Sequence, residues 1–147
     1  MSIIEFGGGY GGLCNIISKS VKLTDYTFVE IEAPLELAKK CFINTDVNVI
    51  TYLPEDAIKE DKKYDLFISE YGFCELNDDG MDKYICLLEK SNNAYLTMNL
   101  WDKNKKTKFK NKLNTIFDTV EEHPLYIGSE WGDYVLVCKG INIKKND

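Results

Sequence analysis

The sequence contains no arginine: its 18 basic residues are all lysine, against 24 acidic residues, and the net charge is −6. Arginine is the residue that most often reads guanine and binds phosphate through two hydrogen bonds. Its absence, together with the acidic balance, predicts no nucleic-acid partner. A single histidine, His123, excludes a metal site built from several histidines of one chain.

Paired cysteines and long apolar runs are also missing. The five cysteines form no CxxC motif, so a disulfide framework or a zinc site is not expected, and a reduced, cytoplasmic setting is the default. The longest apolar runs are too short to span a bilayer. The first residues lack a basic region and a cleavage site. The sequence therefore predicts no secretory signal and no membrane partner.

The 147 residues suit one domain, 1–147, in which strands and helices alternate. Runs rich in β-branched and aromatic residues predict seven strands, at 2–6, 26–31, 47–52, 64–69, 94–99, 121–127 and 133–139. Helical patterns lie between them, at 12–18, 33–42, 81–90 and 105–117. A turn at 128–132 joins the last two strands without a helix, so that pair is expected to be antiparallel. This order predicts a single α/β sandwich.

Five glycines surround one tyrosine directly after the first strand, in the run GGGYGG. The run fits G-x-G-x-x-G, the dinucleotide fingerprint, and also E-x-G-x-G-x-G from Glu5 to Gly11. In both cases the glycines allow a tight turn and let a ligand approach the backbone. In both cases Glu30, at the end of the second strand, can bind ribose hydroxyls. A purely structural turn is the third interpretation.

Three features favour S-adenosylmethionine (SAM) over a dinucleotide. Glu5 would repel a pyrophosphate but not the cationic methionine end of SAM. After seven strands no residues remain for the substrate domain of a dehydrogenase. The antiparallel terminal hairpin is typical of SAM methyltransferases.

Three blocks of the sequence, EFGGGYGGL, YTFVEIEAPLELA and YDLFISEYGFCEL, resemble the sugar O-methyltransferase family within the class I SAM-dependent methyltransferases. The resemblance implies a Rossmann-like three-layer sandwich, with a seven-stranded, mostly parallel sheet and an antiparallel strand seven. It also implies methyl transfer from SAM to a hydroxyl of a sugar or sugar-containing acceptor, including a nucleotide-activated one.

The resemblance also implies roles for particular residues. Around the methionine moiety of SAM it places Glu5, Gly7, Gly9, Tyr10 and Gly11. It places Glu30 on the ribose, Tyr52 and Leu53 beside the adenine, and Ser69, Glu70 and Tyr71 beneath the reacting centre.

A general base that takes the acceptor proton is expected in the loop after the fourth strand, since ligands collect at the carboxyl ends of parallel strands. Glu75 is the first candidate and Glu70 the second. His123 and Cys74 are better explained as structural residues. Asp78, Asp79 and Gly80 are better explained as a turn before a helix than as a metal site.

The acceptor pocket is expected to contain aromatic faces, because sugars stack on them. Phe73 and Trp101 are candidates, as are Tyr10 and Tyr71. Lysines crowd the start of the helix after the fifth strand. The ordinary interpretation is a solvated helix face. The alternative hypothesis is that Lys103, Lys105 and Lys106 hold the phosphates of a nucleotide-activated or phosphorylated sugar.

Members of this family usually carry a helical segment ahead of the first strand, whereas Met1 adjoins that strand here. Part of the sheet and of the cofactor cleft is therefore expected to be uncovered, and a second copy or a companion chain is expected to bury it. Two other functions stay open: a SAM-binding subunit that is inactive alone, and a nicotinamide-dinucleotide-binding domain.

Overall fold

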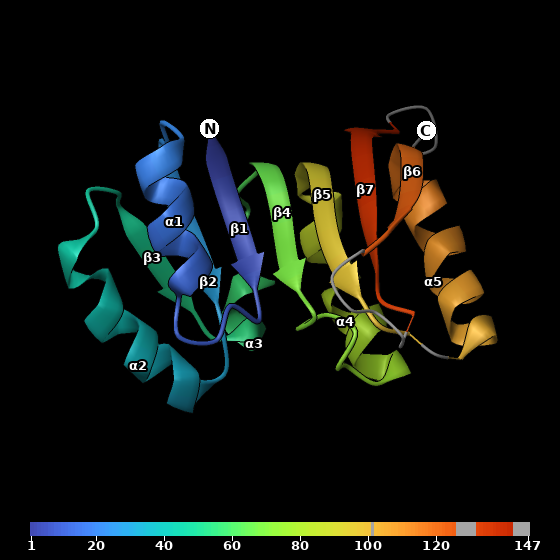
Figure 1. Ribbon diagram of the computed structural model, residues 1–147, viewed down its shortest axis with the longest axis horizontal. Helices are drawn as coiled ribbons and strands as arrows, with labels where there is room; N and C mark the ends of the chain where they lie inside the picture. Colours follow the sequence, from blue (N-terminus) through green and yellow to red (C-terminus); the bar gives the residue numbers. More distant parts are fainter. Residues whose placement is uncertain (101, 126–131, 143–147) are drawn as a thin grey trace.

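The computed structural model describes residues 1–100, 102–125 and 132–142. Its strands form one seven-stranded sheet in the order β3-β2-β1-β4-β5-β7-β6 (Figure 1). The strands are β1 (Ser2–Phe6), β2 (Asp25–Val29), β3 (Val49–Tyr52), β4 (Tyr64–Glu70), β5 (Ser91–Met98), β6 (Phe117–Pro124) and β7 (Tyr134–Ile141). The helices are α1 (Gly12–Ser20), α2 (Glu32–Cys41), α3 (Pro54–Ala57), α4 (Asp78–Glu89) and α5 (Lys103–Ile116), with a 3₁₀ turn at Phe42–Asn44.

The strand directions confirm the predicted fold class. β3, β2, β1, β4 and β5 pair in parallel, and β7 runs antiparallel to both of its neighbours, β5 and β6. The carboxyl ends of the five parallel strands therefore meet at one edge of the sheet, which we call the carboxyl edge. Because β7 is antiparallel, its first residues also lie at this edge. Most of the predicted turn at 128–132 falls outside the described residues.

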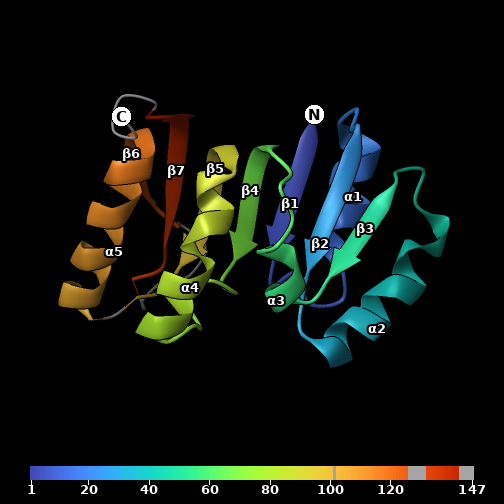
Figure 2. The same ribbon diagram turned by 180° about the vertical axis from the view of Figure 1, so that it is seen from behind.

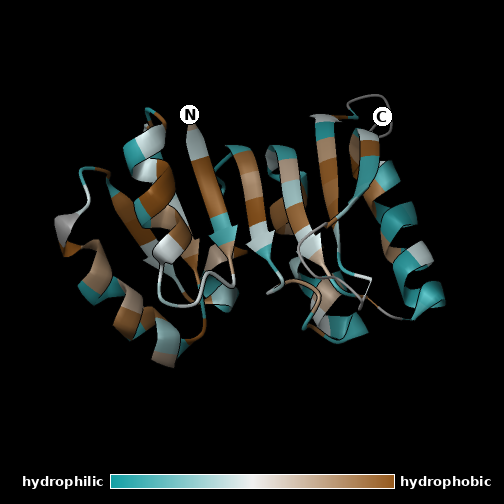
Figure 3. Ribbon diagram, in the orientation of Figure 1, coloured by the Kyte–Doolittle hydropathy of each residue, from teal (hydrophilic) through white to brown (hydrophobic). Residues whose placement is uncertain are grey.

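Two apolar cores lie on opposite faces of the sheet, as expected for strands that are covered on both sides. On one face, α1 and α2 contribute Cys14, Leu35 and Ala38 to the core. On the other face, which Figure 2 shows from the front, α3, α4 and α5 cover a larger core that contains Phe6, Phe67 and Phe73. Figure 3 shows apolar residues along the strands in the middle of the sheet and polar residues on the outer surface of α5.

The α1 face of the sheet is only partly covered. Beside α1, an open groove of about 650 Å³ crosses β4, β5 and β7. Its apolar lining includes Leu13 and Ile17 of α1 and Leu66, Tyr95 and Val137 of the strands. In the part of the chain that the structure describes, no helix lies over these three strands on this side (Figure 1).

Helix caps explain where α4 and α5 begin. The side chain of Asn77 accepts the N–H of Gly80 at 2.8 Å, so α4 starts at Asp78 and includes the residues that the sequence assigned to a turn. Acidic side chains in a first turn are favourable, because the amino end of a helix is positive. Asp102 caps α5 by accepting the N–H groups of Asn104 and Lys105, which stabilises a helix that starts among lysines.

Candidate functional site

The glycine loop between β1 and α1 turns through backbone conformations that favour glycine. Gly7, Gly9 and Gly11 have φ angles of 74°, 60° and 82°. A Cβ added to Gly7 would stand 2.7 Å from the Cα of Gly72, so the loop lies directly against the turn that follows β4. A Cβ added to Gly9 would meet no atom within 4 Å. The backbone at Gly9 is therefore open to a ligand, whereas Gly7 is required by packing.

Glu30 follows β2 and reaches the same loop. One oxygen of its carboxylate, Oε2, accepts the N–H of Gly9 at 2.8 Å, and the other, Oε1, accepts the N–H of Ile31 at 2.8 Å. The sequence places this side chain on the ribose of the cofactor, and the structure brings it to the glycine loop. Each oxygen keeps a lone pair for a further donor.

Glu5 lies beneath the loop and is 1% exposed. The hydroxyl of Tyr26 donates to its Oε2 at 2.8 Å. Burial raises the pKa of Glu5 to about 7, against the opposing hydrogen bond from Tyr26, and the charges of Glu70 and Glu30 add to the rise. The carboxylates of Glu30 and Glu70 are thus near enough to Glu5 for their charges to act on it, and of the two, Glu30 contacts the loop, at Gly9.

The turn after β4 is joined to β1 by Ser69, which is fully buried. Its hydroxyl donates to the carbonyl of Phe6 at 2.9 Å and accepts the N–H of Phe73 at 2.9 Å. The sequence assigned Ser69 to the cofactor, but its hydroxyl is occupied inside the protein, where it positions the turn. Next to it, Glu70 accepts a hydrogen bond from Thr97 at 2.7 Å.

Tyr71 has a φ angle of 64°, the one positive value among the non-glycine residues that the structure describes. Its hydroxyl donates to Oδ2 of Asp133 at 3.1 Å and so joins the β4 turn to the start of β7. Burial, followed by this hydrogen bond, raises the pKa of Tyr71. Strained backbone of this kind gathers at functional sites. Asp133 is a site residue that the sequence did not reveal, because its partner lies 62 residues away.

A cavity of about 350 Å³ opens at the carboxyl edge between β1, β2 and the β4 turn. Gly7, Glu30 and Glu75 all line it. The first candidate for the base therefore lies beside the glycine loop and Glu30, whereas Glu70 lines the groove on the α1 face. Glu55 of α3, which the sequence analysis missed, also lines the cavity.

The residues predicted beside the adenine, Tyr52 and Leu53, end β3 at the same edge. The carbonyl of Tyr52 accepts the N–H of Glu30 at 3.2 Å, and Leu53 is 37% exposed. Glu55 follows two residues later and accepts hydrogen bonds from the hydroxyl of Tyr84 at 2.7 Å and from Lys83 at 3.2 Å. The bond from Tyr84 is the main reason why the pKa of Glu55 is lowered.

The aromatic residues predicted for the acceptor lie in different places. Phe73 is fully buried and packs against Phe6, Phe67 and Phe109. Phe73 therefore belongs to the core rather than to the acceptor pocket. Its backbone N–H donates to the buried hydroxyl of Ser69, which fixes Phe73 in this position. Tyr10, at the tip of the glycine loop, is 65% exposed. Trp101 lies outside the described residues.

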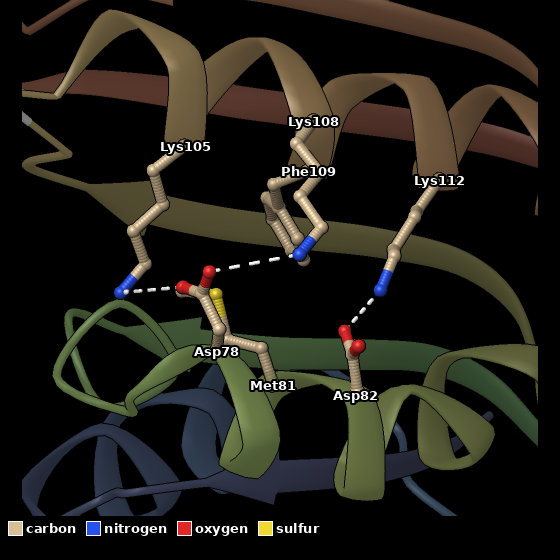
Figure 4. A pocket seen from close by; sticks show the side chains of 7 residues that line it. All are labelled: Asp78, Met81, Asp82, Lys105, Lys108, Phe109 and Lys112. Carbon is tan, nitrogen blue, oxygen red and sulfur yellow. Dashed lines mark hydrogen bonds and ion pairs between the residues drawn. The ribbon is translucent and has the colours of Figure 1, made fainter.

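Two of the three lysines predicted for the acceptor phosphates are paired within the chain. The Nζ of Lys105 donates to the carbonyl of Leu76 at 3.0 Å and lies 3.5 Å from Asp78. Figure 4 shows this contact beside two further ion pairs between α5 and α4, Lys108 with Asp78 and Lys112 with Asp82. Lys106 pairs with Glu122 at 2.6 Å and lies 3.7 Å above the ring centre of Tyr134. Lys103 is exposed. These contacts hold α5 to its neighbours.

Other chemistry-bearing residues have structural surroundings. The thiol of Cys74 donates to the carbonyl of Tyr71 at 2.9 Å, and burial raises its pKa. His123 lies on β6 with its Nε2 3.4 Å from Glu121. Among the described residues, no group of three acidic, cysteine or histidine side chains could hold a metal ion. None of the described helices is long and apolar enough to cross a membrane.

No protein-family model matches the chain, and no curated protein sequence does. Solved structures resemble it in fold. The methyltransferase domain of the bacterial Hen1 protein CtHen1-CN has a TM-score of 0.73 and 15% identity, over 94% of this chain and 89% of that one. An rRNA methylase from Streptococcus thermophilus has a TM-score of 0.72 and 9% identity, over 95% and 86% of the two chains. Human methyltransferase-like protein 13, in complex with S-adenosylhomocysteine (SAH), has a TM-score of 0.68 and 14% identity, over 100% and 75%.

The rRNA methylase corrects one expectation. The prediction of no nucleic-acid partner is wrong, because a protein that shares this fold is a methylase of RNA. The net charge of a whole chain does not describe the charge at one site, so the acidic balance does not exclude a nucleic-acid partner. The neighbours likewise give no support to a sugar acceptor. What the chain shares with them is the class I SAM-dependent methyltransferase fold.

Proposed function

We propose that the protein is a SAM-dependent methyltransferase. The observation that carries the proposal is the contact between Glu30 and the N–H of Gly9 at the carboxyl edge, 2.8 Å long. It places an acceptor for ribose hydroxyls beside the one loop position where a ligand can touch bare backbone. Ligands of open α/β sheets bind at this edge. Two of the fold neighbours, human methyltransferase-like protein 13 and TrmK of M. capricolum, are complexes with SAH.

The residues present fit SAM better than a dinucleotide. SAM carries a sulfonium and an ammonium group, and Glu5, Glu30 and Glu70 supply negative charge around the loop. Glu5 and Glu70 would repel a pyrophosphate, which dinucleotide sites bind at the positive amino end of a helix, whereas Glu30 suits the ribose of either ligand. The nicotinamide interpretation is therefore disfavoured by electrostatics rather than by the glycine pattern, which both ligands share.

The sulfonium of bound SAM supplies an activated methyl group, so the chain has three tasks. Glu30 and the glycine loop would hold the cofactor. The β4 turn, fixed to β1 by Ser69, would position the acceptor, and alignment of the acceptor with the methyl group is a major part of catalysis. Glu75, which lines the cavity together with Gly7, takes the acceptor proton.

The finer proposal is that the acceptor atom is a hydroxyl oxygen, as the resemblance to the sugar O-methyltransferases implies. The hydroxyl can belong to a free sugar or to the ribose of an RNA, since an rRNA methylase shares the fold. A neutral hydroxyl loses its proton during transfer, so a carboxylate within reach is useful. Both candidates are exposed. Glu75 lines the cavity, whereas Glu70 lies outside its lining and accepts a hydrogen bond from Thr97 at 2.7 Å.

Transfer of tritium from methyl-labelled SAM tests this function. The purified chain is incubated separately with nucleotide sugars, with total RNA and with total protein. We expect label in one pool, with Glu75→Gln slowing transfer by about 10²–10⁴-fold and leaving SAH affinity unchanged. Binding of SAH without transfer to any pool would instead identify a SAM-binding subunit that needs another chain.

A further inference from the structure

Glu5 is a buried acid without a basic partner among the residues that the structure describes. It is 1% exposed, and a Cβ added to Gly8 would stand 2.6 Å from its carboxyl carbon. The carboxyl group therefore lies directly under the middle of the glycine loop. One oxygen is bound by Tyr26, and the other, Oε1, faces Gly8.

The groups around Glu5 come from each element packed against it. Tyr26 and Glu30 come from β2 and its end, Glu70 from β4, and Cys14 from α1. Burial raises the pKa of the Cys14 thiol to about 12, so it stays neutral. Among the described residues, no lysine forms an ion pair with Glu5. The charged form of Glu5 thus lacks a counter-ion in the described part of the chain, and a buried charge of this kind is costly.

SAM and SAH differ by one charge next to the transferred group. The sulfur of SAM is a sulfonium cation, and the sulfur of SAH is a neutral thioether. All their other groups are the same, including the α-amino group. A buried carboxylate interacts with such a charge much more strongly than an exposed one, because the surroundings have a low dielectric constant.

We propose that Glu5, held by Tyr26 beneath the glycine loop, is the counter-charge that makes this site prefer SAM to SAH. This inference rests on the proposed function. Binding of SAM supplies the cation that Glu5 lacks and draws a proton off its carboxyl group. Transfer of the methyl group then removes the sulfonium charge, and Glu5 takes up a proton again as SAH leaves. The same residue thereby favours binding of the substrate and release of the product.

Calorimetric titration of the whole chain with SAM and with SAH, at pH 6 and pH 8, tests the inference. Below about pH 7 most Glu5 is protonated. The ionised fraction of Glu5 increases about tenfold from pH 6 to pH 8. The ratio of the SAH Kd to the SAM Kd should therefore increase over this range, by about tenfold at most. The α-amino group titrates at lower pH in SAM than in SAH, because the positive sulfonium is close to it. Each Kd is therefore first corrected for the measured α-amino pKa of its free ligand.

Three variants distinguish this role from a structural one. In Glu5→Gln the ratio should be low and independent of pH. Tyr26→Phe removes the hydrogen bond that lowers the pKa of Glu5. The increase of the Kd ratio with pH should therefore occur at higher pH in this variant. Glu70→Gln removes a charge that raises the pKa, so the rise should move to lower pH. Circular dichroism checks that each variant is folded.

The outcomes are separable. If both ligands bind and the ratio changes with pH in the wild type but not in Glu5→Gln, the inference is supported. If both bind with the same ratio at each pH, or if Glu5→Gln changes with pH as the wild type does, Glu5 does not discriminate between them. If neither ligand binds, the proposed function fails, and this inference fails with it.

Discussion

The carboxylate of Glu30 accepts the backbone N–H of Gly9 at 2.8 Å, which joins the end of β2 to the glycine loop that follows β1. These two segments are 21 residues apart in the chain. The contact fixes the loop and also leaves the carboxylate at its surface. Glu30 is therefore placed to organise the site before a ligand arrives, which lowers the cost of binding.

Replacement of Glu30 by alanine should weaken SAH binding by roughly 1.5–3 kcal/mol, the range for a hydrogen bond to a charged group. Glu32→Ala is the matched control, because Glu32 is an exposed acid two residues further along the chain. Isothermal titration of both variants measures the difference. Equal affinities for Glu30→Ala and the wild type would remove Glu30 from the cofactor site.

The loop glycines should differ in what they tolerate. Gly9→Ala should cost about 1–2 kcal/mol of stability, because alanine is strained at positive φ, and should abolish SAH binding, since its methyl group occupies the open space above the loop. Gly7→Ala should destabilise the fold more, because its Cβ would stand 2.7 Å from backbone of Gly72. Urea denaturation and SAH titration of both variants check this order. Wild-type affinity in Gly9→Ala would mean that the ligand does not touch Gly9.

Glu5 should make the stability of the ligand-free protein depend on pH. Its pKa is about 7 in the folded protein, against an ordinary value of 4.5. Between these values the folded state keeps a proton that the unfolded state has lost, so the free energy of unfolding should fall as pH rises, by on the order of 3 kcal/mol in full. Above about pH 7 this contribution is constant.

Glu5→Gln should lack this dependence. Its free energy of unfolding, relative to that of the wild type, should increase between pH 5 and pH 8. Urea denaturation at the two pH values measures this difference. A difference that is the same at both pH values would show that Glu5 titrates normally in the folded protein.

Lys105 should matter for stability, and Lys103 should not. Lys105 donates to the carbonyl of Leu76 at 3.0 Å, in addition to its pairing with Asp78, whereas Lys103 is exposed at the start of α5. Lys105→Ala should therefore lower the melting temperature by about 2–4 °C, which corresponds to about 1 kcal/mol for a domain of this size. Lys103→Ala should leave it unchanged. Equal melting temperatures in scanning calorimetry would mean that the contacts of Lys105 with Leu76 and Asp78 add no stability.

The sequence predicted every strand and the four long helices, because their apolar periodicity is strong. It missed α3, since Pro54–Ala57 is too short for a helical pattern. It placed the start of β5 three residues late, because Ser91 and Asn93 are polar and join the strand by pairing with β4 and β7. It also placed β6 late, since α5 passes into β6 at Phe117 without a turn.

The sequence predicted the site residues that belong to one local motif. It missed the contacts that form between segments far apart in the chain. The glycines and Glu30 stand in local patterns. The bond from Tyr26 to Glu5 and that from Tyr71 to Asp133 depend on sheet order and on the antiparallel β7, which place distant residues side by side. Phe73 was assigned to the acceptor because a loop aromatic and a core aromatic look the same in sequence.

Titration of the wild-type chain with SAH and with NADH, side by side at pH 7.5 or so, tests the central claim most directly. The structure leads us to expect SAH binding at one site per chain and no heat from NADH, because Glu5 lies under the glycine loop at Gly8 and the charge of Glu70 acts on Glu5. Binding of NADH without binding of SAH would contradict the account, since it would show that a pyrophosphate is accepted where the carboxylates should repel it.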